Sequence, residues 1–121
     1  MEVEFSENAQ GIKTCLVKGV RLHSSYNPQK EAERFVENLE CSFNPLYVVV
    51  TEPALSYCAA PLKKKYPSAI LCALRYDRAF DSYNSLFDKI FYADDKNLED
   101  ELFNFMGEEG TSSALFASWQ P

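Results

Sequence analysis

A few residues of this chain have side chains that could bind or transform a ligand. Glu52 and Arg75 each come directly after an apolar run, and Asp77 lies two residues beyond Arg75. A carboxylate and a guanidinium in such places can pair with each other or hold a polar ligand. His23 is the single histidine of the chain, so it is the candidate for proton transfer at neutral pH.

The surroundings of His23 favour a structural role over a catalytic one. Ser24, Ser25 and Tyr26 follow it and lead into a predicted helix start, where serine and histidine side chains can satisfy loose backbone groups. General-base catalysis needs a partner carboxylate, and the sequence places none for His23. Phosphate-loop, Ser-His-Asp and metal-ligand motifs are also absent from the sequence. We therefore predict no catalytic residue, no metal site and no cofactor.

Alternating strands and helices would position these residues. Helices are predicted over Pro53–Lys65, Arg78–Phe87 and Leu98–Met106. Pro61 should kink or break the first of them, and a loop from Gly107 to Gly110 should follow the last. This alternation implies parallel pairing of the strands. The expected strand order is Lys89–Tyr92, Ala69–Leu74, Leu46–Thr51 and Ala114–Trp119.

The first part of the chain has a different pattern. Val3–Phe5 and Ile12–Val17 predict a β-hairpin, with Gly11 supplying the positive φ of its turn. A helix is predicted over Pro28–Glu40 with Asn27 as its N-cap. Its apolar face consists of Ala32, Phe35, Val36 and Leu39.

Together these elements predict an α/β fold. We expect a Rossmann-like half sheet of about four parallel strands with helices on both faces, preceded by an N-terminal β-hairpin. Residues 1–25 would form the hairpin arm and residues 26–121 the Rossmann-like domain, within a single domain overall. The chain stops at Pro121, directly after the last predicted strand, so we expect a fragment of a longer protein.

Composition and charge restrict the classes of partner. The 121 residues carry a net charge of −6, which argues against general binding to nucleic acid or to an anionic membrane. The N-terminus does not resemble a signal peptide, and no apolar run is long enough to span a membrane. The four cysteines are scattered, so we expect reduced thiols in a cytoplasmic protein; they are Cys15, Cys41, Cys58 and Cys72.

Two segments carry a family resemblance. One is Leu22–Pro28 (LHSSYNP) followed by Glu31–Phe35 (EAERF), and the other is the strand, turn and helix start that ends in Tyr57, with Tyr66-Pro67 and Tyr76-Asp77 beyond it. Together they resemble the front of the motility-associated-factor proteins, which are flagellin glycosyltransferases related to the MptE-like hydroxymethylpterin diphosphokinase group. The resemblance implies an N-terminal Rossmann-like domain in front of a larger catalytic domain, within flagellin modification.

The predicted ligand crevice departs from the family pattern. The family turn resembles Gly-Leu-Gly-Leu-Gly-Tyr, and here Glu52, Ala54 and Ser56 stand at the glycine positions while Tyr57 matches. Arg75 stands where an acid would bind a ribose. Glu52 would repel a phosphate, and the added side chains would hinder close approach to the backbone. We expect a salt bridge between Glu52 and Arg75 to fill the vacated site.

Two functions are consistent with this sequence. The first is a non-catalytic docking or assembly domain with a degenerate nucleotide crevice, partnered by a catalytic domain or protein of flagellin modification, with a homodimer also possible. The second is a small-molecule or nucleotide-sugar binding domain, or a transferase, that uses the crevice. Its residues would be Glu52, Ala54, Ser56, Tyr57, Arg75 and Asp77.

Overall fold

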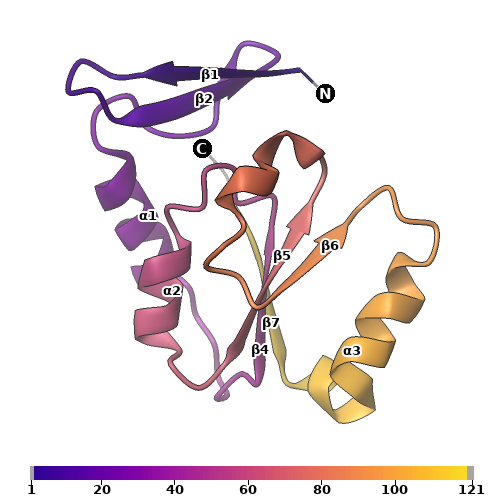
Figure 1. The fold of residues 1–121 in the computed structure, drawn as a ribbon. Coiled ribbons are helices and arrows are strands. Elements are labelled where there is room, and N and C mark those ends of the chain that lie inside the picture. The colour runs from indigo at the N-terminus through magenta and orange to yellow at the C-terminus, as the bar shows by residue number, and fades with distance from the viewer. Residues whose placement is uncertain (1, 120–121) are drawn as a thin grey trace.

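A four-stranded parallel sheet forms the centre of the molecule (Figure 1). The computed structural model describes residues 2–119. The strand order is β6-β5-β4-β7, as predicted, and no boundary of these four strands differs from its prediction by more than one residue. The chain is therefore an α/β protein. The strands are β4 (Tyr47–Thr51), β5 (Ile70–Arg75), β6 (Lys89–Tyr92) and β7 (Ala114–Ser118).

Helices cover both faces of this sheet (Figure 1). Helices α1 (Pro28–Glu37) and α2 (Ala59–Lys65) pack on one face, where they contact Val48 and Val50 of β4. Helix α3 (Leu98–Ser112) packs on the other face, where Val49 meets Met106. This division follows from the strand itself, because successive side chains of β4 point to opposite faces.

Helix α1 begins as predicted and ends early. The side chain of Asn27 accepts a hydrogen bond from the backbone N–H of Lys30 at 3.0 Å, and Pro28 occupies the first helical position. The helix ends at Glu37 instead of the predicted Glu40. The ammonium group of Lys65 in helix α2 donates to the carbonyl oxygens of Val36 at 2.9 Å and Leu39 at 2.8 Å, so a neighbouring helix helps to satisfy the carbonyl groups at this end.

The prediction that a helix starts at Pro53 is wrong. Helix α2 begins at Ala59, and residues 52–58 form a loop. Glu52, Ala54 and Ser56 have φ angles of 41°, 50° and 67°, which a right-handed helix excludes. The predicted break at Pro61 is also absent, because Pro61 lies in the first turn of α2, where its missing N–H is not needed.

Two later helices also differ from their predictions. The predicted helix Arg78–Phe87 is a 3₁₀ helix, η1, that ends at Tyr83. Helix α3 continues beyond Met106 through the predicted loop to Ser112, with a kink at Gly107, where φ is 73°. Gly110 lies against the ring of Tyr47, and a Cβ there would approach a ring carbon to 2.7 Å.

The N-terminal hairpin is present and belongs to a three-stranded antiparallel sheet of β1 (Val3–Glu7), β2 (Lys13–Val17) and β3 (Val20–Arg21). Gly11 has the positive φ predicted for the first turn. The small sheet lies beyond the carboxyl ends of the parallel strands (Figure 1), and its Cys15 packs against Ala54, Leu55 and Phe80. It therefore covers the edge of the parallel sheet at which the predicted crevice lies.

Three of the four cysteines belong to the interior. Cys15, Cys58 and Cys72 are buried, and all four thiols are unpaired. Burial raises the pKa of Cys58 and of Cys72 to about 12, so both remain protonated at neutral pH. Within residues 2–119, no helix has the length and apolar character needed to cross a membrane. The predicted hairpin arm (1–25) and Rossmann-like domain (26–121) include residues 1, 120 and 121, which lie outside the described residues.

Candidate functional site

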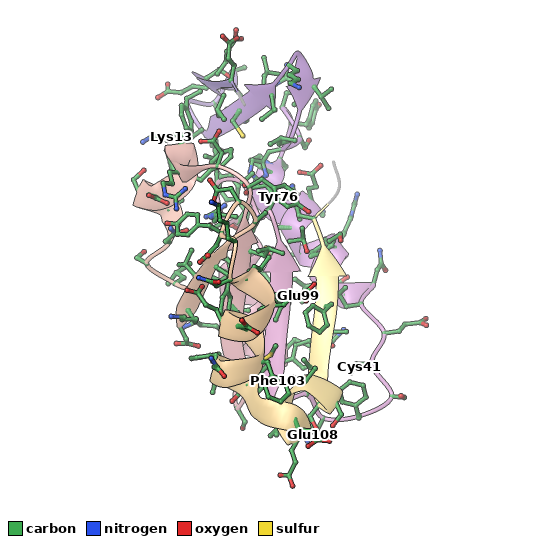
Figure 2. The ribbon with its side chains drawn as sticks, turned by 90° about the vertical axis from the view of Figure 1, so that its right-hand side faces the viewer. Lys13, Cys41, Tyr76, Glu99, Phe103 and Glu108 are labelled. Carbon is green, nitrogen blue, oxygen red and sulfur yellow. The ribbon has the colours of Figure 1, made fainter. Side chains whose placement is uncertain are left out.

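Glu52 and Arg75 meet at the carboxyl edge of the parallel sheet. Strands β4 and β5 pair in register, with Thr51 opposite Leu74, so the residues that follow are neighbours. Arg75 Nη1 donates to Glu52 Oε2 at 2.9 Å. The predicted salt bridge is therefore confirmed. Tyr76, which follows Arg75, marks this edge between the two sheets in Figure 2.

The guanidinium of Arg75 is fully buried, and every one of its donors can be accounted for. Arginine has five N–H groups in a fixed planar arrangement. Five contacts match them; the acceptors are Asn84 Oδ1 (2.9 Å from Nε), Glu52 Oε2 (2.9 Å) and Ala54 O (2.7 Å) for Nη1, and Ser56 Oγ (2.8 Å) and Tyr83 O (3.4 Å) for Nη2. Arg75 has no exposed surface and no donor left for a ligand.

Aromatic rings enclose the same group. The guanidinium carbon of Arg75 lies 5.4 Å from the ring centre of Phe80 and 5.9 Å from that of Phe87. Both rings are buried, and both are close enough to attract the cation through their π faces. They also keep water away from the guanidinium, which strengthens its hydrogen bonds.

The carboxylate of Glu52 occupies a set of donors typical of an anion site. One oxygen accepts from the backbone N–H of Ala54 at 3.1 Å as well as from Arg75, and the other accepts from the backbone N–H of Tyr76 at 3.0 Å. Backbone N–H groups and a guanidinium are the donors that proteins use to hold phosphates and carboxylates. Here a side chain of the protein itself provides the anion.

The loop keeps a glycine-type backbone without glycine. Glu52, Ala54 and Ser56 stand where the family resemblance implies glycines, and all three have positive φ. For a residue with a Cβ, this conformation costs roughly 1–2 kcal/mol. The side chains of Glu52 and Ser56 both bond to Arg75, and so does the carbonyl of Ala54. The hydrogen bonds to Arg75 thus offset the conformational cost of the positive φ angles, and those angles in turn place the loop groups that make the bonds.

The two other predicted site residues have different roles. The hydroxyl of Tyr57 donates to the carbonyl oxygen of Lys13 at 2.6 Å and so fastens the loop to strand β2. The carboxylate of Asp77 accepts from the backbone N–H of Ala79 at 2.8 Å and caps η1. The structure therefore brings four of the six predicted residues into one network. Tyr57 and Asp77 stabilise the elements around it.

His23 is buried and its side chain satisfies a backbone group, as the structural interpretation of this residue predicts. Its Nε2 accepts a hydrogen bond from the backbone N–H of Leu55 at 3.0 Å, and its ring centre lies 4.9 Å from that of Tyr57 and 5.3 Å from that of Trp119. Burial, with a smaller contribution from the charge of Arg75, lowers the pKa of His23 to about 4. The imidazole is therefore neutral at pH 7, as its acceptor role requires.

His23 and Trp119 fill a second part of the same edge. Trp119 follows β7, and its backbone N–H donates to the carbonyl oxygen of Thr51 at 3.2 Å, while its indole N–H donates to Leu22 O at 2.8 Å. These rings lie where the ends of β4 and β7 meet. In open α/β sheets, ligands bind at the point where the strand order reverses, and here that point lies between β4 and β7.

Sequence reasoning missed the residues that η1 contributes. Tyr83 supplies its carbonyl oxygen to Arg75 and to the hydroxyl of Ser56, and Asn84 supplies its side-chain oxygen to Arg75. No pattern in the sequence distinguishes these residues from an ordinary helix end. No protein-family model, curated protein or solved structure matches the chain.

Loss of the buried guanidinium should be far more costly than loss of an exposed one. Arg75→Met leaves the carboxylate of Glu52 largely buried without its cation, so the free energy of unfolding should fall by about 3–5 kcal/mol. Arg78→Met is the matched control, because Arg78 pairs with Asp94 at 3.2 Å with both side chains mostly exposed. Its cost should be below about 1 kcal/mol. Urea unfolding measures both, and equal costs would contradict the buried network.

Stability should fall as the pH decreases through the range in which His23 titrates in the unfolded chain. The pKa of His23 is about 4 in the folded protein and 6.5 for an unperturbed histidine. Its contribution to the free energy of unfolding is therefore complete above pH 6.5 and is lost as the pH falls toward 4. The loss amounts to about 3 kcal/mol. His23→Gln keeps an acceptor for Leu55 but does not titrate, and should remove this part of the slope. Urea unfolding at several pH values is the measurement; identical slopes for both proteins would exclude this role.

Proposed function

We propose that this chain is a non-catalytic Rossmann-like domain that acts in docking or assembly and whose nucleotide crevice is filled by its own side chains. The observation that carries this proposal is the state of Arg75. It lies at the end of a central strand, it has no exposed surface, and protein acceptors match all its donors. A nucleotide at this position would have to displace Glu52 and open the loop.

Packing around the crevice supports the same proposal. Pro53 is fully buried beside the salt bridge, and Ser56 is buried as well. His23 and Trp119 pack against each other at the neighbouring strand ends. A binding domain would be expected to present a concave surface with free polar groups at this edge. Three surface hollows lie elsewhere: between α1 and α2, around the start of α1, and around the start of α3.

The family context of the proposal is flagellin modification. It is supported by the resemblance of Leu22–Pro28, which leads into α1, and of Glu31–Phe35, which lies within that helix. Within this segment the backbone N–H of Ser24 donates to the carboxylate of Glu31 at 2.8 Å, and Asn27 caps the helix. A catalytic domain or protein would act beside this one, and this chain would position it.

A ligand panel tests the filled crevice. Thermal shift and calorimetry with ATP, nucleotide sugars and S-adenosylmethionine should show no binding at millimolar ligand, because Glu52 already occupies the anion donors. A nucleotide that binds with micromolar affinity would overturn the proposal. Comparing the affinity of that ligand for Arg75→Lys, which lacks the planar set of donors, with its affinity for the unchanged protein would show whether the ligand uses the crevice.

Gene deletion tests the family context. Loss of the gene should abolish flagellin glycosylation, and complementation with Asp77→Asn should restore it, because no chemistry in the proposal depends on that carboxylate. Normal glycosylation and motility without the gene would remove the link to flagellin modification. Mass spectrometry of flagellin distinguishes these outcomes.

A further inference from the structure

One face of the parallel sheet is covered only in part. Helix α3 packs on β4, β5 and β6 through Val49, Cys72 and Phe91. Strand β7 contributes only Ala114, its first residue, to that cluster. Figure 2 shows β7 beside α3 with no helix in front of it. Parallel strands are normally covered on both faces, and within residues 2–119 nothing covers the α3 side of β7 beyond Ala114.

The uncovered area is apolar. Phe116 is paired in register with Val49, so its side chain points to the α3 side of the sheet, where it is 55% exposed. Phe103 of α3 is also 55% exposed and lies on the side of the helix seen in Figure 2. We refer to Phe103 and Phe116, together with the α3 side of β7, as the α3–β7 surface. An exposed apolar patch that is rimmed by polar residues is a feature of protein interaction sites, whereas a single exposed apolar side chain is not.

The surroundings of this surface are acidic. Helix α3 contains no lysine or arginine, and the five acids on it lie toward its two ends; they are Glu99, Asp100, Glu101, Glu108 and Glu109. Figure 2 shows Glu99 and Glu108 on either side of Phe103 along the helix. Strand β7 itself has no charged residue. A partner therefore needs an apolar centre and basic flanks.

We propose that the α3–β7 surface docks an amphipathic helix of a partner protein, with an apolar stripe flanked by lysine and arginine. A helix is the element that ordinarily covers a parallel sheet beside another helix. Charge complementarity selects the basic partner over a second copy of this chain, since two copies would place acidic α3 helices together and each copy carries a charge of −6. This inference rests on the proposed docking function and names the chemistry of the partner.

A designed peptide tests the surface. The probe is a labelled helical peptide of about 18 residues, with leucine on one face and lysine on the other. Fluorescence anisotropy should detect its binding to the full chain, and the double variant Phe103→Gln, Phe116→Thr should weaken it by about tenfold or more. High salt should weaken it as well. Val20→Thr is the matched control, because Val20 is 56% exposed but lies in β3, within the N-terminal sheet.

Three results would overturn the proposal. They are unchanged binding by the double variant, equal binding of the peptide with glutamate in place of lysine, and self-association of the chain that Phe116→Thr abolishes in sedimentation experiments. Both substituted side chains are exposed, and thermal unfolding of the double variant checks that its fold is intact. Nucleotide binding in the ligand panel would contradict the filled crevice but would not change the binding of the peptide to the α3–β7 surface. The two proposals can therefore fail separately.

Discussion

The burial of one guanidinium is the constraint on which much of this structure depends. An arginine without solvent must give each of its N–H groups an acceptor, and its charge must be balanced, because an unpaired buried charge costs several kcal/mol. Arg75 meets these conditions with acceptors from three segments: the loop after β4, the 3₁₀ helix η1 and the residue that follows it. The positive φ values of Glu52, Ala54 and Ser56 bring that loop within reach of the guanidinium.

The same loop joins the two sheets. Leu55 packs against the N-terminal sheet and donates its N–H to His23, while Tyr57 donates its hydroxyl to Lys13 of β2. The small sheet therefore packs on one side of the loop of residues 52–58, and hydrogen bonds from Arg75 hold the conformation of that loop. The network, the aromatic cluster of His23 and Trp119 and the small sheet all lie at the edge where α/β sheets usually bind ligands, and these contacts support the proposal that the crevice is filled.

Sequence patterns predicted the fold better than they predicted the site. Apolar runs that are local in sequence locate the parallel strands, and the alternation of strands and helices predicts their order, as in half of a doubly wound sheet. The meeting of Glu52 with Arg75 then follows from the pairing of β4 with β5. The loop from Glu52 to Cys58 was predicted as helix, because its residues suit a helix start and nothing local indicates positive φ at a glutamate or an alanine. The parts played by Tyr83 and Asn84 depend on how η1 packs, which no spacing in the sequence encodes.

NMR of the Arg75 guanidinium tests the filled crevice most directly. Five hydrogen bonds and complete burial predict separate Nη–H resonances that exchange slowly with water at neutral pH and do not move when millimolar ATP is added. The exposed guanidinium of Arg78 provides the internal reference, with averaged and rapidly exchanging signals. Signals from Arg75 that resemble those of Arg78, or that shift with ATP, would contradict a crevice filled by the protein's own side chains.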